Sequence, residues 1–85
     1  MADSIINNLA VRKKTITVTT NNMGLISLSL SLNDSVPVAV RTGTKICVIS
    51  PYTWSTYWYA KVQLDDGTIV ANEELTVDVF WLPFK

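Results

Sequence analysis

Five of the chain's eight aromatic residues lie in the short segment 52–59, where their spacing assigns them to different environments. If 57–64 forms a β-strand, its side chains alternate between the two faces of a sheet. One face then carries two tyrosine rings, an ammonium group and an amide, beside a loop that holds Trp54. Aromatic rings with polar tips suit stacking on a flat ligand or packing against another subunit. The candidate ligand-binding residues are Trp54, Tyr57, Tyr59, Lys61 and Gln63.

The other face of the same segment is predicted to join the core. Alternation places Trp58, Ala60, Val62 and Leu64 there. A simpler interpretation of the whole aromatic segment is that its rings fill a small sandwich and cover its edge. Trp58 fits that interpretation best, whereas the outward tyrosines leave both interpretations open.

Side chains that do catalysis are scarce. The chain has no histidine, which removes the commonest general base and excludes Ser/His/Asp and Cys/His nucleophilic arrangements. The single Cys47 has no partner for an intrachain disulfide, and no Cys/His cluster is available to hold a structural metal. We expect Cys47 to pack as a small hydrophobic residue.

The acidic residues and glycines also lack a catalytic or phosphate-binding pattern. Two carboxylate pairs, Asp65-Asp66 and Glu73-Glu74, are adjacent in sequence and typical of a solvated turn and a strand start. Their spacing does not match a calcium-binding loop. The glycines occur singly in three separate turns, so no glycine-rich phosphate loop is present. We therefore expect no enzymatic activity, no cofactor and no metal.

The elements that position these residues are predicted to be strands. From residue 14 onward apolar and polar side chains alternate with a period of two, which indicates an all-β chain. A single sheet would leave a whole apolar side in water, so two packed sheets are favoured. We predict a small antiparallel β-sandwich of about six to seven strands. The predicted strands are 14–20, 25–32, 36–40, 45–50, 57–64 and 74–82, with a short segment at 68–71.

Local features predict how some of these strands are placed. The segment 21–24, Asn-Asn-Met-Gly, tolerates positive φ and predicts a tight antiparallel hairpin between the first two strands. Pro37 cannot donate to a ladder, so the third strand is expected at the periphery. The run 46–49 is apolar at every position, as in a strand that is covered on both faces.

Size and composition favour an oligomer. A domain of 85 residues buries only roughly 60 to 65% of the surface that its unfolded chain exposes. Hydrophobic residues make up 48% of the chain and charged residues 16%, which leaves a surplus of apolar surface. Association is then the remaining source of stability. The candidate oligomer interface lies on the outer side of the last strand, at Phe80, Leu82 and Phe84.

Net charge and the N-terminal sequence limit the classes of partner that we expect. Seven basic and seven acidic residues cancel, so we expect no nucleic-acid partner. The cationic run 12–14 is interpreted as a solvated strand start. No segment has the pattern of a secretion signal or the length to cross a bilayer, so we expect no membrane partner and synthesis in a cytoplasm. An N-terminal arm or linker, 1–13, extended or as a short helix, is predicted to precede the β-sandwich domain, 14–85.

Four segments together resemble a recurring viral domain. They are Thr-Thr-Asn-Asn-Met-Gly at 19–24, the Ser/Leu strand that follows it, Trp-Tyr-Ala-Lys-Val at 58–62, and the ending from Asp-Gly at 66–67 through the alternating strand to residue 82. Over roughly 14–85, this pattern is similar to the C-terminal β-domain of bacteriophage tail fibres and related tail appendages. One departure is that only about a dozen residues precede the domain, whereas a fibre tip usually ends a long shaft. The chain is then either a small free-standing virion protein or a piece of a longer fibre.

The resemblance implies a small β-sandwich that forms a homotrimer at a fibre tip, in the virion, after synthesis in the host cytoplasm. It also implies a non-enzymatic receptor-binding role toward a bacterial surface glycan or protein. In that role Trp54, Tyr57 and Tyr59 would stack on sugar rings, and Lys61 and Gln63 would bond to hydroxyl groups. Two alternatives stay open: a purely structural virion component, such as a decoration or baseplate protein, and a small phage-encoded inhibitor that binds a host protein.

Overall fold

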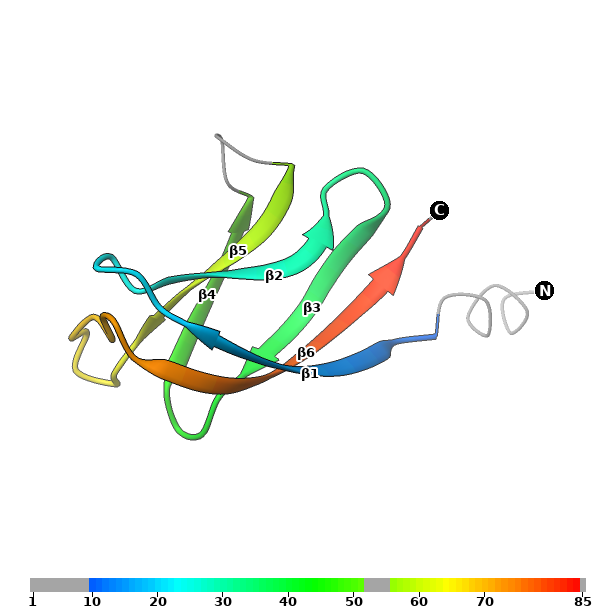
Figure 1. Cartoon of the computed structure of the whole chain (residues 1–85). Coiled ribbons are helices and arrows are strands. Elements are labelled where there is room, and N and C mark those ends of the chain that lie inside the picture. Colours follow the sequence, from blue (N-terminus) through cyan, green and yellow to red (C-terminus); the bar gives the residue numbers. More distant parts are fainter. Residues whose placement is uncertain (1–9, 52–55, 85) are drawn as a thin grey trace.

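Two three-stranded antiparallel sheets form the protein (Figure 1). The computed structural model describes residues 10–51 and 56–84. The strands are β1 Arg12–Thr19, β2 Leu25–Ser31, β3 Ser35–Arg41, β4 Ile46–Pro51, β5 Tyr57–Gln63 and β6 Glu74–Pro83. Sheet A has the order β1-β6-β3, and sheet B has the order β2-β5-β4. The predicted all-β sandwich is thereby confirmed, with six strands.

Alternation along the strands explains how the two sheets hold together. In β6, for example, Leu75, Val77 and Val79 are buried while the side chains between them face outward. The strands of sheet B direct their own buried apolar side chains toward these residues, so one apolar layer lies between the sheets. The buried core comprises Ile26, Leu28, Leu30, Ala60, Val62, Val70, Leu75, Val77 and Val79.

The predicted hairpin between the first two strands is wrong. β1 pairs with β6 along its whole length, and β2 pairs with β5. The segment 20–24 therefore carries the chain from sheet A to sheet B instead of turning it back. Its Asn21 side chain accepts hydrogen bonds from the backbone N–H groups of Met23, at 2.8 Å, and Leu25, at 3.0 Å. The segment does form a tight turn, in which the Gly24 N–H donates to the Asn21 carbonyl at 3.0 Å, but this turn builds a corner between two sheets.

This corner is tied to the segment that leads into β6. The backbone N–H of Thr20 donates to the carbonyl of Glu73 at 2.9 Å. In return, the N–H of Glu73 donates to the Thr20 hydroxyl at 3.0 Å. Thr20 is buried, and this exchange satisfies its hydroxyl, as a buried polar group requires.

The prediction that 45–50 is covered on both faces is also wrong. β4 is an edge strand of sheet B, and its outward side chains Ile46 and Val48 are 41% and 49% exposed. Cys47 and Ile49 point the other way and pack, half-buried, against the core. The apolar run therefore has one packed face and one solvent face.

Several boundaries also differ from those predicted. β1 begins at Arg12, two positions before its expected start. Leu64 is exposed rather than in the core, because β5 ends at Gln63 and the chain turns there. The segment 68–71 adds only an isolated bridge between Ile69 and Gln63. β3 is an edge strand, as Pro37 predicted. The predicted N-terminal arm lies largely outside the described residues.

Candidate recognition face

The outer face of sheet B gathers most of the predicted ligand-binding residues. In an antiparallel sheet, residues directly opposite each other point to the same side. Pairing places Ser27 and Ser50 on either side of Tyr59, and Leu25 and Val48 on either side of Lys61. Ile46 lies opposite Gln63. We call this set the sheet B face: Leu25, Ser27, Ile46, Val48, Ser50, Tyr59, Lys61 and Gln63.

The individual candidates differ in exposure. Tyr59, Lys61 and Gln63 are half-buried and alternate along β5, as predicted. Tyr57 is 47% exposed and lies opposite Ser31, at the end of the same strand. Trp54 lies outside the described residues, as does its neighbour Tyr52. The structure thus brings together Tyr59, Lys61 and Gln63, with Tyr57 adjoining them.

Sequence reasoning missed the residues that flank β5 on this face. Ser27, Ser50 and Val48 come from β2 and β4, and their positions depend on the pairing of strands distant in sequence. Alternation shows that each belongs to one face of its own strand, but it does not show which strand lies alongside. For Ile46 and Val48 the sequence does indicate a common face, because β-branched residues at alternate positions of a strand point to the same side.

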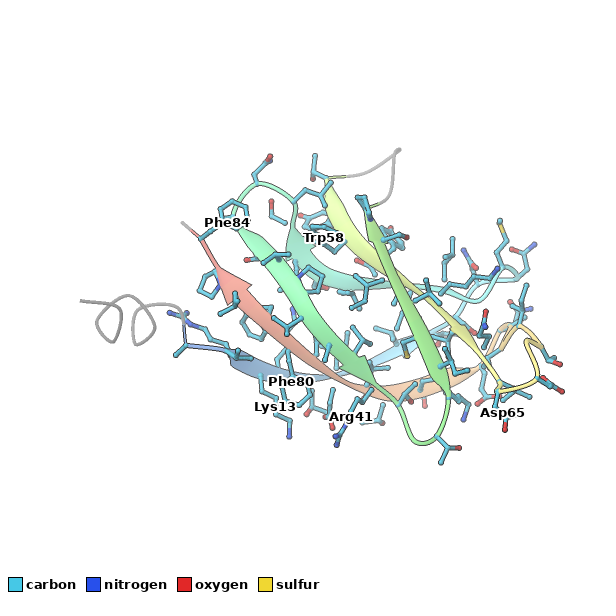
Figure 2. The ribbon with its side chains drawn as sticks, turned by 180° about the vertical axis from the view of Figure 1, so that it is seen from behind. Lys13, Arg41, Trp58, Asp65, Phe80 and Phe84 are labelled. Atoms are coloured by element: carbon cyan, nitrogen blue, oxygen red, sulfur yellow. The ribbon has the colours of Figure 1, made fainter. Side chains whose placement is uncertain are left out.

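The outer face of sheet A holds the predicted interface residues. Phe80 lies between two cations, with the Lys13 ammonium 5.9 Å and the Arg41 guanidinium 6.0 Å from its ring centroid. Figure 2 shows these three side chains together on the outside of the sheet. Leu82 is half-buried opposite Val36, and Phe84 is exposed beyond the end of β6. Phe80 is therefore more covered within the chain than Phe84 is.

The basic run 12–14 divides between the two sides of sheet A. Lys13 lies on the outer face, whereas the Lys14 ammonium is 5.5 Å from the ring centroid of Trp81. It also donates a hydrogen bond to the Ser29 carbonyl at 3.1 Å. Burial lowers the pKa of Lys14 below its ordinary value of 10.5, because the charged form is less well solvated there. This lysine joins β1 to β2 and does not contribute to a surface cation patch.

The carboxylates behave as turn and surface groups. The Asp66 carboxylate accepts the Thr68 backbone N–H at 2.9 Å. Hydrogen bonds from the backbone and side chain of Thr68 lower the pKa of Asp66 below its ordinary value of 3.8. A carboxyl group that acts as a general acid near neutral pH needs a shift in the opposite direction. Glu73 is exposed and lies 3.9 Å from the Lys45 ammonium.

The described residues form no enclosed site. Across 10–51 and 56–84 there is no pocket, and no group of three or more Cys, Asp or Glu side chains is placed to hold a metal ion. Nor does this part of the chain contain a helix of the length and apolarity needed to cross a membrane. What it offers a partner is a broad sheet surface with mixed aromatic, cationic, amide and apolar groups.

Comparisons with known proteins add no further guide to function. No family model, no curated protein sequence and no solved structure matches this chain.

Proposed function

We propose that the protein is a non-enzymatic recognition module of a bacteriophage virion, belonging to a tail fibre or tail appendage. In this proposal it oligomerises and binds a bacterial surface glycan or receptor through the sheet B face. The observation that carries the binding role is the alternation of Tyr59, Lys61 and Gln63 on one outward face, flanked by Ser27 and Ser50. The assignment to a phage rests on the sequence resemblance alone.

The chemistry of this face suits a saccharide. A tyrosine ring offers a flat apolar surface on which the C–H face of a sugar ring can lie. An ammonium, an amide and two serine hydroxyls around it supply donors and acceptors for sugar hydroxyl groups. Because the face is open, an extended or branched polymer can lie across it without entering a pocket. A protein receptor would use the same aromatic and apolar groups, with Val48 and Ile46 at the margin.

Substitutions on two outer faces test the binding role. The double variant Tyr57→Ala/Tyr59→Ala removes two rings from sheet B, and Thr17→Ala/Thr19→Ala makes a matched double truncation at exposed positions of sheet A. Binding is read on an array of bacterial surface polysaccharides, and mass by light scattering. We expect the tyrosine variant to lose binding with unchanged mass, and the threonine variant to retain both.

The other outcomes point to the alternatives. Broken assembly in the tyrosine variant, with no glycan bound by the wild type, would assign the face to subunit contacts in a purely structural virion component. The exposed Ile46 and Val48 on the edge strand give that candidate its own support. A wild-type monomer that binds no glycan would favour a small inhibitor of a host protein. The trimer implied by the resemblance predicts a mass three times 9.5 kDa.

A further inference from the structure

Four edge strands bound the two sheets, and three of them carry features that discourage pairing with another chain. β1 starts with consecutive cations at 12–14. β2 has a shift in register and a residue with positive φ, Ser29 at 55°. β3 contains Pro37 and a register shift next to it. Charges, proline and bulges are the usual devices that protect an exposed sheet edge.

β4 has none of these features along 46–50. Its pairing with β5 is continuous, with no shift in register. It carries no charged side chain between Ile46 and Pro51, and its only proline is the last residue. Its outward side chains include Ile46 and Val48, both exposed. An unprotected, apolar edge of this kind is a template for strand addition.

The hydrogen-bond pattern shows which groups β4 presents at its outer edge, which pairs with no described strand and is called here the free edge. The Val62 N–H donates to the Gly24 carbonyl at 2.8 Å, and the Val62 carbonyl accepts from Val70 at 3.0 Å. Both Val62 groups thus point away from β4, which makes its pair with Cys47 a non-hydrogen-bonded one. Pairs alternate along an antiparallel ladder. The N–H and C=O groups of Cys47 and Ile49 therefore point outward, toward the free edge.

We propose that a second copy of this chain occupies the β4 edge, paired antiparallel about a two-fold axis through Val48. In this arrangement Cys47 of each copy exchanges two hydrogen bonds with Ile49 of the other. Val48 faces its own counterpart in a non-hydrogen-bonded pair, and Ile46 lies opposite Ser50. The edge is self-complementary, since every outward donor meets an acceptor. With no charge on 46–51, two copies meet without like-charge repulsion.

Apolar side chains add to the stability of the proposed contact. Strand pairing of this length is aided by the apolar Val48 and Ile46, which lose water contact across the axis. The three-stranded sheet B of one copy and that of the other would then join into one sheet of six strands, a common size for an open sheet.

The pairing also has a consequence for the proposed binding role, and this consequence rests on that proposal. A two-fold axis perpendicular to a sheet keeps both outer faces on the same side. Tyr59, Lys61 and Gln63 of the two copies would then form one continuous surface. Two linked faces raise the apparent affinity for a repeating polymer without any new contact.

Matched charge substitutions at two edges test the two-fold contact. Val48→Lys places a cation against its own counterpart, whereas Val38→Lys makes the same change on β3, where Val38 is 50% exposed. By light scattering we expect wild type and Val38→Lys to be dimers of twice 9.5 kDa, and Val48→Lys to be a monomer of 9.5 kDa. A wild-type monomer would overturn the proposal. A wild-type trimer would overturn it too, while leaving the proposed virion role in place.

A cross-linking experiment identifies the register. Opposite residues of a non-hydrogen-bonded pair have Cα atoms about 4.5 Å apart, within the range that a disulfide spans. In a Cys47→Ser background, Val48→Cys should form a reducible dimer on oxidation, and Val38→Cys should not. Equal cross-linking at both positions would overturn the proposal. So would slow amide hydrogen exchange at Cys47 and Ile49 in a monomer, which would assign the edge to another segment of the same chain.

Discussion

The indole N–H of Trp58 donates a hydrogen bond to the backbone carbonyl of Ser35 at 2.8 Å. This bond runs from β5 in sheet B to the first residue of β3 in sheet A. The Ser35 residue is buried and Trp58 is half-buried, so little water is available to replace the bond. It joins two sheets that share no backbone ladder in the described part of the chain.

Trp58→Phe is expected to lower the free energy of unfolding by about 1 to 3 kcal/mol, because the Ser35 carbonyl is left without its donor. Urea denaturation followed by circular dichroism measures the change. Trp81→Phe is the control, since it makes the same ring contraction at a half-buried tryptophan that packs against the core with its ring facing the Lys14 ammonium. Equal losses in the two variants would show that ring volume, and not the hydrogen bond, causes the effect.

Gly24→Ala should be strongly destabilising. Gly24 has φ +77°, and a Cβ there would lie 2.7 Å from the Ile69 Cγ2 and 2.9 Å from the Val62 carbonyl oxygen. Left-handed backbone costs about 1 to 2 kcal/mol for a residue with a Cβ, and the clash adds about 1 to 3 kcal/mol.

Gly67→Ala separates the backbone cost from the cost of the clash. Gly67 has φ +90°, but no described residue apart from its chain neighbours lies within 4 Å of the added Cβ. It should show the backbone term alone, about 1 to 2 kcal/mol. The same urea titration applies to both variants. A Gly24→Ala protein no less stable than Gly67→Ala would contradict the close contact at the corner between sheets.

Ser29→Gly is expected to stabilise the protein by about 0.5 to 1 kcal/mol. Ser29 adopts φ 55° within β2, a conformation that glycine accepts without steric cost, although glycine loses more entropy on folding. Asn72 also has φ 55°, but asparagine tolerates this region better. Asn72→Gly should therefore change stability much less, and a thermal melt of both variants distinguishes the two positions.

The pH dependence of stability should include a contribution from Cys47. Burial raises the pKa of the Cys47 thiol above its ordinary value of 9.0, because the thiolate is less well solvated in the folded chain. The unfolded chain then ionises first. The stability linked to this thiol is present below pH 9.0 and is lost as the pH rises through the higher folded value.

Urea midpoints of wild type and Cys47→Ala, measured from about pH 7 to about pH 10, isolate this contribution. The wild type should lose more stability over that range than the variant does. Other groups that titrate in the same range affect both proteins and cancel in the difference. An equal loss of stability with pH in wild type and Cys47→Ala would show that the Cys47 thiol does not contribute. Thiol-specific reagents should also react faster after unfolding than before it.

The strands themselves were predictable from the sequence because period-two alternation is a local property. Ile16 and Val18 face the core while Thr15 and Thr17 face outward, and the same rule located the core of β6. It also placed Tyr59, Lys61 and Gln63 together on an outer face, since residues of one strand share a face whatever lies beside them.

Strand neighbours were not predictable in the same way. Alternation determines a residue's face but leaves the identity of the adjacent strand open, and the segment 21–24 has the chemistry of a hairpin and of a corner alike. The pairing of β1 with β6 and of β2 with β5 distinguishes them, and that pairing depends on residues far along the chain. For the same reason, the four apolar residues 46–49 did not show whether a further layer covers their outer side.

The strand order of sheet A has a consequence for how the protein forms. Thr15 and Asp78, hydrogen-bonded across β1 and β6 at 2.8 Å, are separated by 63 positions, and β6 is also the strand to which β3 pairs. Closing such long loops is entropically costly and slows folding. As a ribosome releases the chain, β1 and β3 remain without their central strand until β6 emerges. Sheet B can begin earlier from the β4–β5 pair, so its ladder is expected to precede that of sheet A during synthesis.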